Sequence, residues 1–371
     1  MSRDGECMHT FRVLEPFTFP RTGTTVSNRL VVAAMTNKQS NADGSLSDDE
    51  LAWLRARTSF GVVTTCAAHV SRDGQGWEGE LGVFDDALLP GLERLATALR
   101  KGGTLGLVQI FHGGVRAPSS LTGMQPWSAS EFELDSPNFE RPRAGTTRDI
   151  EDTIAAFASA ARRCAQAGFA GVELHGAHGY LISQFLGTVT NTREDDWGGS
   201  LERRARFVRE VLSAVKDAVP ESFLVGVRLS PEIPEQGIVL DEALQVARWL
   251  VEDGVDFMHV SNWDSFKATV AHPDSKKPLT TWFREAVGPE VPVIATGGVW
   301  TPAEADTLLE HGADLVGLAR AAIGNARWPE HAATPGWDPV RPPYPAEHLR
   351  ENALGEAFVD YMRRWPGFVA E

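Results

Sequence analysis

The chain has 371 residues, of which 42% are hydrophobic and 23% charged, and it contains 35 glycines and 22 prolines. This composition is typical of an ordered globular protein and excludes a low-complexity or disordered chain. The formal net charge of -15 makes nucleic acid and anionic membrane surfaces unfavourable partners.

Eight short apolar runs follow one another along the chain, and each has the length of one β-strand. They occupy residues 29–36, 61–68, 104–111, 170–175, 223–230, 255–262, 291–298 and 313–320. Stretches with the apolar spacing of amphipathic helices separate them, at 87–101, 149–168, 200–218, 240–254 and 301–312. Several of these stretches begin at Ser, Thr or Asp and end at Gly, which are the preferred helix-capping residues.

Apolar strands that alternate with amphipathic helices indicate a parallel sheet covered by helices. We therefore predict an α/β fold, a single (βα)8 TIM barrel over about residues 28–325 within one domain of residues 1–371. The alternative, an open sheet with a dinucleotide fingerprint, lacks a G-x-G-x-x-G segment after the first strand. We further predict an N-terminal lead-in that forms a hairpin below the barrel (1–28), an inserted loop after strand 3 (112–148) and a C-terminal tail with one helix (326–371).

The N-terminal residues include no long apolar segment, and no apolar run in the chain approaches the length of a membrane-spanning helix. The three cysteines, Cys7, Cys66 and Cys164, share no CxxC spacing. We therefore expect a soluble cytoplasmic protein without membrane partners, disulfides or a cysteine-ligated metal.

Polar residues and glycines stand at the carboxyl ends of the predicted strands, where barrel enzymes gather their functional groups. Gly297, Gly298, Gly317 and Arg320 near the last two strands predict a phosphate site, although tight turns and a surface charge are the alternative. Arg228 and Gln109 end otherwise apolar strands and suit a planar nucleotide-like ring, whereas a structural salt bridge at Arg228 is the alternative. Other residues at strand ends are Thr36, Cys66, Ala67, His112, Ser261, Asn262 and Ala319.

The segment VELHGAHGYLISQFL places His175, His178 and Tyr180 directly after a predicted strand. A metal site would need a third ligand, and no His, Asp, Glu or Cys follows within one turn, so we predict none. A second alternative is that these side chains pack in the core. We favour a hydrogen-bonding clamp for a substrate oxygen, with Tyr180 as the neighbouring acid.

Together these segments resemble the old yellow enzyme family of FMN-dependent ene-reductases. The resemblance rests on residues 28–36, Gln109 with the HGG at 112–114, 175–186, 191–211, 227–231, 294–299 and 317–320. It implies an FMN site formed by Ala34, Met35, Thr36, Ala67, Gln109, Arg228, Gly297, Gly298, Gly317, Ala319 and Arg320. It also implies NADPH or NADH as the reductant and a ping-pong reduction of an α,β-unsaturated carbonyl or nitro compound. In that reaction His175 and His178 bind the substrate oxygen, and Tyr180 delivers the proton.

Four positions depart from the family pattern. Ala34 stands where the family usually has Pro, Lys38 occupies a position that is aromatic in one branch, and HGGVR has an additional residue before Arg116. The segment FLGTVTN at 185–191 also lacks the usual S-P after the leucine. These departures leave the branch and the small-molecule substrate open. Two other functions remain alternatives, a Schiff-base aldolase that uses Lys267 and a non-catalytic flavin-binding barrel. The oligomeric state is expected to be a monomer or a homodimer.

Overall fold

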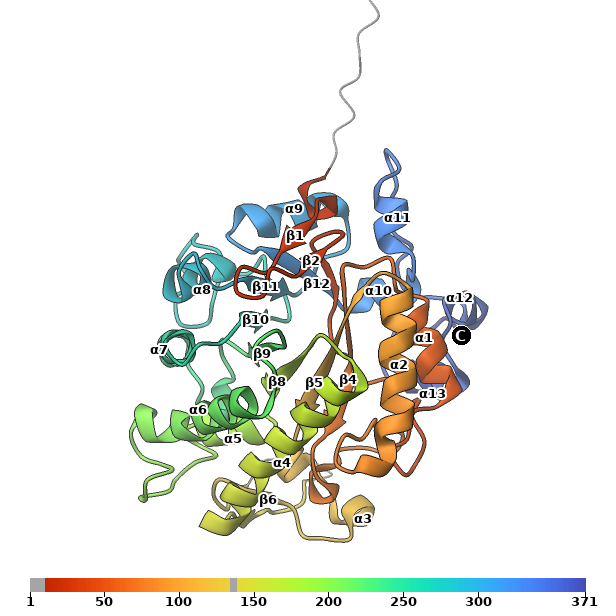
Figure 1. The fold of residues 1–371 in the computed structure, drawn as a ribbon. Coiled ribbons are helices and arrows are strands. Elements are labelled where there is room, and N and C mark those ends of the chain that lie inside the picture. Colours follow the sequence, from red (N-terminus) through yellow and green to blue (C-terminus); the bar gives the residue numbers. More distant parts are fainter. Residues whose placement is uncertain (1–10, 134–138) are drawn as a thin grey trace, which may run out of the picture.

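The computed structural model describes residues 11–133 and 139–371 (Figure 1). Residues 1–10 of the predicted lead-in, with Cys7, and residues 134–138 of the predicted inserted loop lie outside these ranges. Within the described residues, eight parallel strands close into a barrel in the order β10-β11-β12-β3-β4-β5-β8-β9. They are β3 (Leu30–Val32), β4 (Val62–His69), β5 (Leu105–Phe111), β8 (Gly171–Gly176), β9 (Leu224–Leu229), β10 (Phe257–Ser261), β11 (Val293–Thr296) and β12 (Leu315–Leu318). The predicted (βα)8 barrel is therefore confirmed.

Helices surround the barrel, as the ribbon shows (Figure 1). They are α1 (Asp48–Arg55), α2 (Leu89–Lys101), α4 (Thr147–Ala167), α5 (Leu181–Leu186), α6 (Leu201–Ala218), α7 (Leu240–Glu252), α8 (Leu279–Val287) and α9 (Pro302–Glu310). The predicted cap is present on α6, where the Ser200 side chain accepts from the Arg203 N–H, whereas α4 begins two residues before the predicted segment and is capped by Thr146, which forms a capping box with Asp149. The sequence analysis missed α1 and α8, which are 8 and 9 residues long and offer little periodicity to detect.

The end of the barrel at which the strands begin is closed by apolar side chains. Strands β1 (Phe17–Thr18) and β2 (Thr25–Val26) pair antiparallel, so the predicted lead-in hairpin is confirmed. Phe19 and Val26 from this hairpin pack against one buried cluster inside the barrel, formed by Val31, Val62, Leu105, Leu107, Leu224, Phe257, Ile294 and Leu315. Because this end is filled, only the carboxyl ends of the strands remain open for a ligand.

The segment after β5 carries the predicted insertion as short elements. They are a 3-10 turn (Gly114–Arg116), α3 (Ser119–Thr122), β6 (Trp127–Ser128) and β7 (Arg143–Ala144), and β6 pairs with β7. In the described part of the chain, no helix is both long and apolar enough to cross a membrane.

The C-terminal tail packs beside α1 (Figure 1). The tail follows α10 (Arg320–Gly324) and contains α11 (Trp328–Ala332), α12 (Ala346–Glu351) and the predicted helix α13 (Glu356–Met362), so it has three helices where one was predicted. Arg57 lies buried under it and donates to the carbonyls of Ala322 at 3.0 Å, Ile323 at 2.9 Å and Asn352 at 3.2 Å. Burial lowers the pKa of Arg57 to about 9, so the guanidinium still carries its charge at neutral pH.

We expect Arg57→Met to destabilise the protein by about 2 kcal/mol, because the tail carbonyls lose their donors inside the fold. Urea unfolding measures this change. The neighbouring exposed Arg55→Met is the matched control and should change stability by less than about 0.5 kcal/mol. Equal stability of the two variants would contradict a fastening role for Arg57.

Candidate functional site

A buried cation stands at the open end of the barrel. Arg228 ends β9 and donates to the Ala34 carbonyl at 3.1 Å and to Ser261 Oγ at 2.9 Å. Its Nε–H is buried and has no partner among the described residues. An unpaired buried donor costs about 1–3 kcal/mol, so this N–H suits an acceptor atom of a ligand in the mouth. The alternative, a direct salt bridge at Arg228, is not observed, because no carboxylate among the described residues is in contact with Arg228.

The predicted phosphate residues come together in one pocket at the ends of β9 to β12. Its lining includes His178, Arg228, Ser261, Asn262, Trp263, Thr296, Gly297, Gly298, Gly317, Ala319 and Arg320. A side chain at Gly317 would place its Cβ 1.8 Å from Thr296 Oγ1, and Gly298 has a φ of +76° that favours glycine. At Gly298 and Gly317 no side chain covers the backbone, so a phosphate could approach the backbone closely. Arg320 adds a charge there, 4.9 Å from the Trp263 ring centre.

The Glu173 carboxylate lies inside the barrel and holds neighbouring polar side chains in place by hydrogen bonds. Glu173 is fully buried and accepts from Gln109 Nε2 at 2.7 Å and from His259 Nδ1 at 2.6 Å, and His259 Nε2 lies 2.7 Å from Thr296 Oγ1. Burial alone would raise the pKa of Glu173, but His259, the Arg228 cation and Gln109 hold it below its usual value. Burial lowers the pKa of His259, so this ring is neutral. Glu173 thus balances the charge of Arg228.

Glu173 also fixes the orientation of the Gln109 amide. An ionised carboxylate only accepts, so the Gln109 nitrogen must face it, and the Gln109 oxygen is left to accept from a ligand N–H. The sequence analysis missed Glu173 and His259. A signal existed for Glu173, because VELH places a charged residue two positions before His175 on the same strand face.

The histidine pair lies at the end of β8. The ring centres of His175 and His178 are 5.0 Å apart with the rings at 90°, and the Tyr180 ring is 4.8 Å from His175. His178 adopts a φ of +61°, and its backbone N–H donates to Ser230 Oγ at 3.1 Å. This turn returns the His178 ring toward His175, so the structure brings the three predicted residues together.

The protonation of both rings follows from their partners. The Ser261 hydroxyl accepts from Arg228 and lies 2.7 Å from His178 Nε2, so it can donate its proton to that nitrogen while His178 carries its own proton on Nδ1. The Ala177 N–H donates to His175 Nδ1 at 3.4 Å, which leaves the proton of His175 on Nε2. Burial within the mouth, followed by nearby cations, lowers both histidine pKa values well below the usual value. Each neutral ring therefore offers one N–H donor.

Tyr180 stands against an aromatic wall. Its ring centre lies 4.9 Å from that of Phe111 and 6.4 Å from that of Trp77. Burial raises the pKa of Tyr180, although Arg116 opposes the shift, so the phenol keeps its proton at neutral pH. The additional residue in HGGVR is taken up by the 3-10 turn over Gly114–Arg116, which places the Arg116 guanidinium 5.2 Å from the Tyr180 ring centre.

The remaining predicted cofactor residues lie around the same mouth. Ala34 is buried after β3, Met35 and Thr36 are half-buried beyond it, and Ala67 is the register partner of Gln109. Their loop is anchored by Glu50, which accepts from Asn37 Nδ2 at 3.1 Å, from Ser40 and from Cys66 Sγ at 3.0 Å. The sequence offered no signal for Glu50, which lies on a short helix with several other acidic residues.

We expect the stability of the protein to depend on the protonation of Glu50. Burial raises the pKa of Glu50 despite the hydrogen bonds from Cys66, Ser40 and Asn37, so the folded state keeps a proton that the unfolded chain releases above about pH 4.3. The contribution of Glu50 to stability therefore falls as the pH rises through its folded pKa. Glu50→Gln should flatten the decline in unfolding free energy as the pH rises above the unfolded pKa of Glu50, about 4.3, whereas the exposed Glu202→Gln should leave this decline unchanged. Identical pH profiles for Glu50→Gln and the parent would contradict this assignment.

The geometry gives little support to a metal site or to a Schiff-base lysine. Among the described residues, no group of three or more His, Cys, Asp or Glu side chains could hold a metal ion. The Lys267 side chain is 74% exposed, and its Nζ lies 3.7 Å from Asp264 Oδ2, so it does not enter the barrel as a Schiff-base lysine would.

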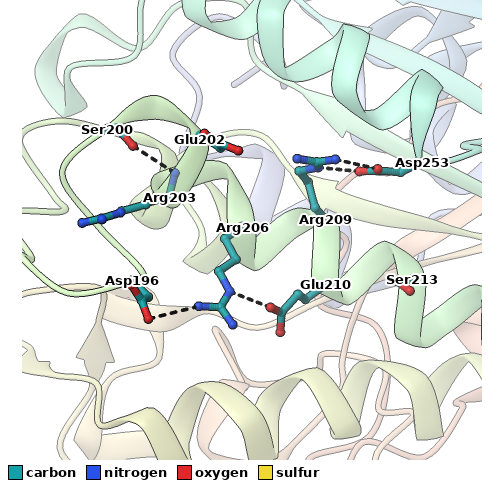
Figure 2. A pocket seen from close by; sticks show the side chains of 9 residues that line it. All are labelled: Asp196, Ser200, Glu202, Arg203, Arg206, Arg209, Glu210, Ser213 and Asp253. Carbon is teal, nitrogen blue, oxygen red and sulfur yellow. Dashed lines mark hydrogen bonds and ion pairs between the residues drawn. The ribbon is translucent and has the colours of Figure 1, made fainter.

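A wide cleft also lies outside the barrel, along α6 (Figure 2). Arg206 is 2.6 Å from Glu210 and 3.8 Å from Asp196, and Arg209 is 2.6 Å from Asp253 (Figure 2). These charges neutralise each other on an exposed surface, so the cleft presents salt bridges rather than a convergent site. The polar groups of the molecule converge instead at the mouth of the barrel.

The barrel, its pocket lined by bare backbone, the buried arginine and the pair of neutral histidines together suit a nucleotide-like cofactor. Residues 12–335 match the model of the NADH:flavin oxidoreductase / NADH oxidase family. The chain belongs to this family, and the predicted resemblance to the old yellow enzymes is confirmed.

The chain is similar to several named proteins. It is 38% identical over 322 residues to the probable NADH-dependent flavin oxidoreductase YqiG of Bacillus subtilis (strain 168), covering 85% of this chain and 86% of that protein. It is 33% identical over 316 residues to an NADPH dehydrogenase of Bacillus licheniformis, covering 84% and 91%. The old yellow enzyme homologue from Zymomonas mobilis has a similar structure, with a TM-score of 0.79, 26% identity and coverage of 94% and 99%. The protein is thus an NAD(P)H-dependent flavin oxidoreductase that uses FMN, as predicted.

Proposed function

We propose that the protein is an ene-reductase that reduces activated alkenes, either α,β-unsaturated carbonyl or nitro compounds, by a ping-pong mechanism. The observation that carries this proposal is the pair of neutral histidine donors, 5.0 Å apart, beside a protonated tyrosine. Two N–H donors on neighbouring rings suit the oxygen of an activating carbonyl or nitro group.

The residues at the strand ends fit FMN. The unpaired Nε–H of Arg228 and the free oxygen of Gln109 would meet the flavin ring, and Ala34, Met35, Thr36 and Ala67 would line it. Gly297, Gly298, Gly317, Ala319 and Arg320 would hold its phosphate. When bound, FMN takes a hydride from NADPH or NADH and delivers it to the β-carbon of the alkene.

The chain itself supplies binding, charge stabilisation and a proton. His175 Nε2–H and His178 Nδ1–H hold the activating oxygen and stabilise the negative charge that develops on it during reduction. The Tyr180 phenol, kept protonated by burial, gives its proton to the α-carbon. The aromatic wall of Phe111 and Trp77 excludes water from the side where Tyr180 stands.

Two measurements test the proposal. The purified protein should be yellow, release FMN on denaturation and oxidise NADPH or NADH faster when cyclohexenone is added without oxygen. Parallel double-reciprocal plots would support the ping-pong order. A non-catalytic flavin barrel would carry flavin but give no enone-dependent oxidation, and that result would reject the ene-reductase assignment.

A further inference from the structure

Arg116 is a cation that faces the mouth without a carboxylate partner. It is exposed, and its guanidinium stands over the Tyr180 ring, 5.2 Å from the ring centre. Among the described residues, no acidic group lies within ion-pair distance of Arg116. Its charge is therefore available to a ligand that reaches Tyr180.

Two further cations lie against α13 rather than beside Arg116. Lys38 is 5.8 Å and Arg364 is 5.9 Å from the ring centre of Tyr361. The buried Glu80 is paired with His69, with 2.8 Å between Oε1 and Nδ1, and not with Arg116. Arg116 thus places a positive charge, unpaired among the described residues, beside Tyr180 in a chain whose net charge is -15.

We propose that the preferred substrates are activated alkenes that carry a carboxylate, which Arg116 binds while His175 and His178 hold the activating oxygen. This inference rests on the proposed ene-reductase function and names its substrate class. Arg–carboxylate hydrogen bonds are directional and strong at a partly desolvated site, so they would select acids over neutral analogues.

The carboxylate stays unchanged in the reaction. The carbon–carbon double bond gains a hydride at the β-carbon and the Tyr180 proton at the α-carbon, and Tyr180 recovers a proton from solvent. NAD(P)H is oxidised to NAD(P)+, so the sum consumes one alkene, one NAD(P)H and one proton and yields the saturated acid.

An anion could also be the phosphates of the reducing dinucleotide. The position of Arg116 over the Tyr180 ring favours the alkene substrate, because Tyr180 must touch the reacting carbons. The phosphates of NAD(P)H are separated from its nicotinamide by a ribose and would bind farther from Tyr180. Lys38 and Arg364 lie toward the C-terminal tail and are better placed for such distant anions.

The test compares a cyclohexenone with a propanoate side chain against the same compound with a propanamide side chain. The parent should reduce the acid with a kcat/KM at least about tenfold higher, and Arg116→Gln should lower this acid-to-amide ratio about tenfold. Any effect of Arg116 on the Tyr180 proton changes both substrates alike and cancels in the ratio. The exposed Arg203→Gln on α6 is the matched control and should keep the parental ratio. Flavin content and melting temperature verify that both variants fold.

Three results separate the possibilities. A parental ratio near one, or an unchanged ratio in Arg116→Gln, would overturn the carboxylate assignment. The assignment would also be overturned if Arg116→Gln slowed flavin reduction by NADPH and NADH relative to a phosphate-free benzyl dihydronicotinamide while the ratio persisted. If the parent reduces neither cyclohexenone nor its derivatives, the ene-reductase proposal itself fails, which is a distinguishable outcome.

Discussion

Replacing His178 with alanine should slow cyclohexenone reduction by about 100-fold to 1000-fold, the usual effect of removing one donor to a developing oxyanion. Ser261 Oγ lies 2.7 Å from His178 Nε2, which leaves Nδ1 of the ring for the substrate oxygen, so removing the ring removes that donor. Binding of phenols, which probe the same clamp, should weaken as well. Anaerobic stopped-flow measurement of the enone-dependent step, with FMN still bound, reports this effect directly.

A control variant distinguishes loss of the histidine clamp from a general loss of structure. His331→Ala, on the exposed surface of α11, is the matched control and should keep the parental rate. Flavin reduction by NADPH should change much less than enone reduction, because the activating oxygen belongs to the oxidising substrate. A His178→Ala variant that reduced cyclohexenone at the parental rate would disprove the clamp.

Replacing Glu173 with leucine should destabilise the protein by about 3–5 kcal/mol, the range expected when one partner of a buried charge pair is removed. The Arg228 cation would lose its balancing charge, and Gln109 and His259 would lose their acceptor. Urea unfolding measures the loss. The exposed Glu202→Gln serves as the reference and should stay within about 0.5 kcal/mol of the parent.

The isosteric Glu173→Gln variant tests the electrostatic part of this role. It keeps the shape of the side chain but leaves the charge of Arg228 unbalanced, so the potential of the bound flavin should become more positive. Spectroscopic redox titration reports this shift independently of turnover. A potential equal to that of the parent would show that Glu173 acts by packing alone.

The barrel could be predicted from the sequence because its signals are local. Each strand is a continuous apolar run, and α4 and α6 carry their caps within three residues of their starts. The histidine pair and Tyr180 were accessible for the same reason, since all three follow one strand. Gly297, Gly298 and Gly317 were found because they cluster at two neighbouring strand ends.

The groups that were missed act over long separations in the chain. Glu173 meets Gln109 across 64 residues and His259 across 86, and Arg57 reaches Ala322 across 265. No local sequence pattern predicts such contacts, because they form only when the barrel closes and the C-terminal tail packs against it. The position of Arg116 over Tyr180 also depends on a turn that the HGGVR segment alone does not specify.

The single hydroxyl of Ser261 joins Arg228 and His178 in one chain of hydrogen bonds. Such chains polarise along their length, so a ligand that draws on Arg228 alters the donor strength that His178 can offer. A substitution at either end of this chain of hydrogen bonds therefore changes the group at the other end. Substitutions at Arg228 and His178 should therefore show epistasis, with a double variant that departs from the sum of the single effects.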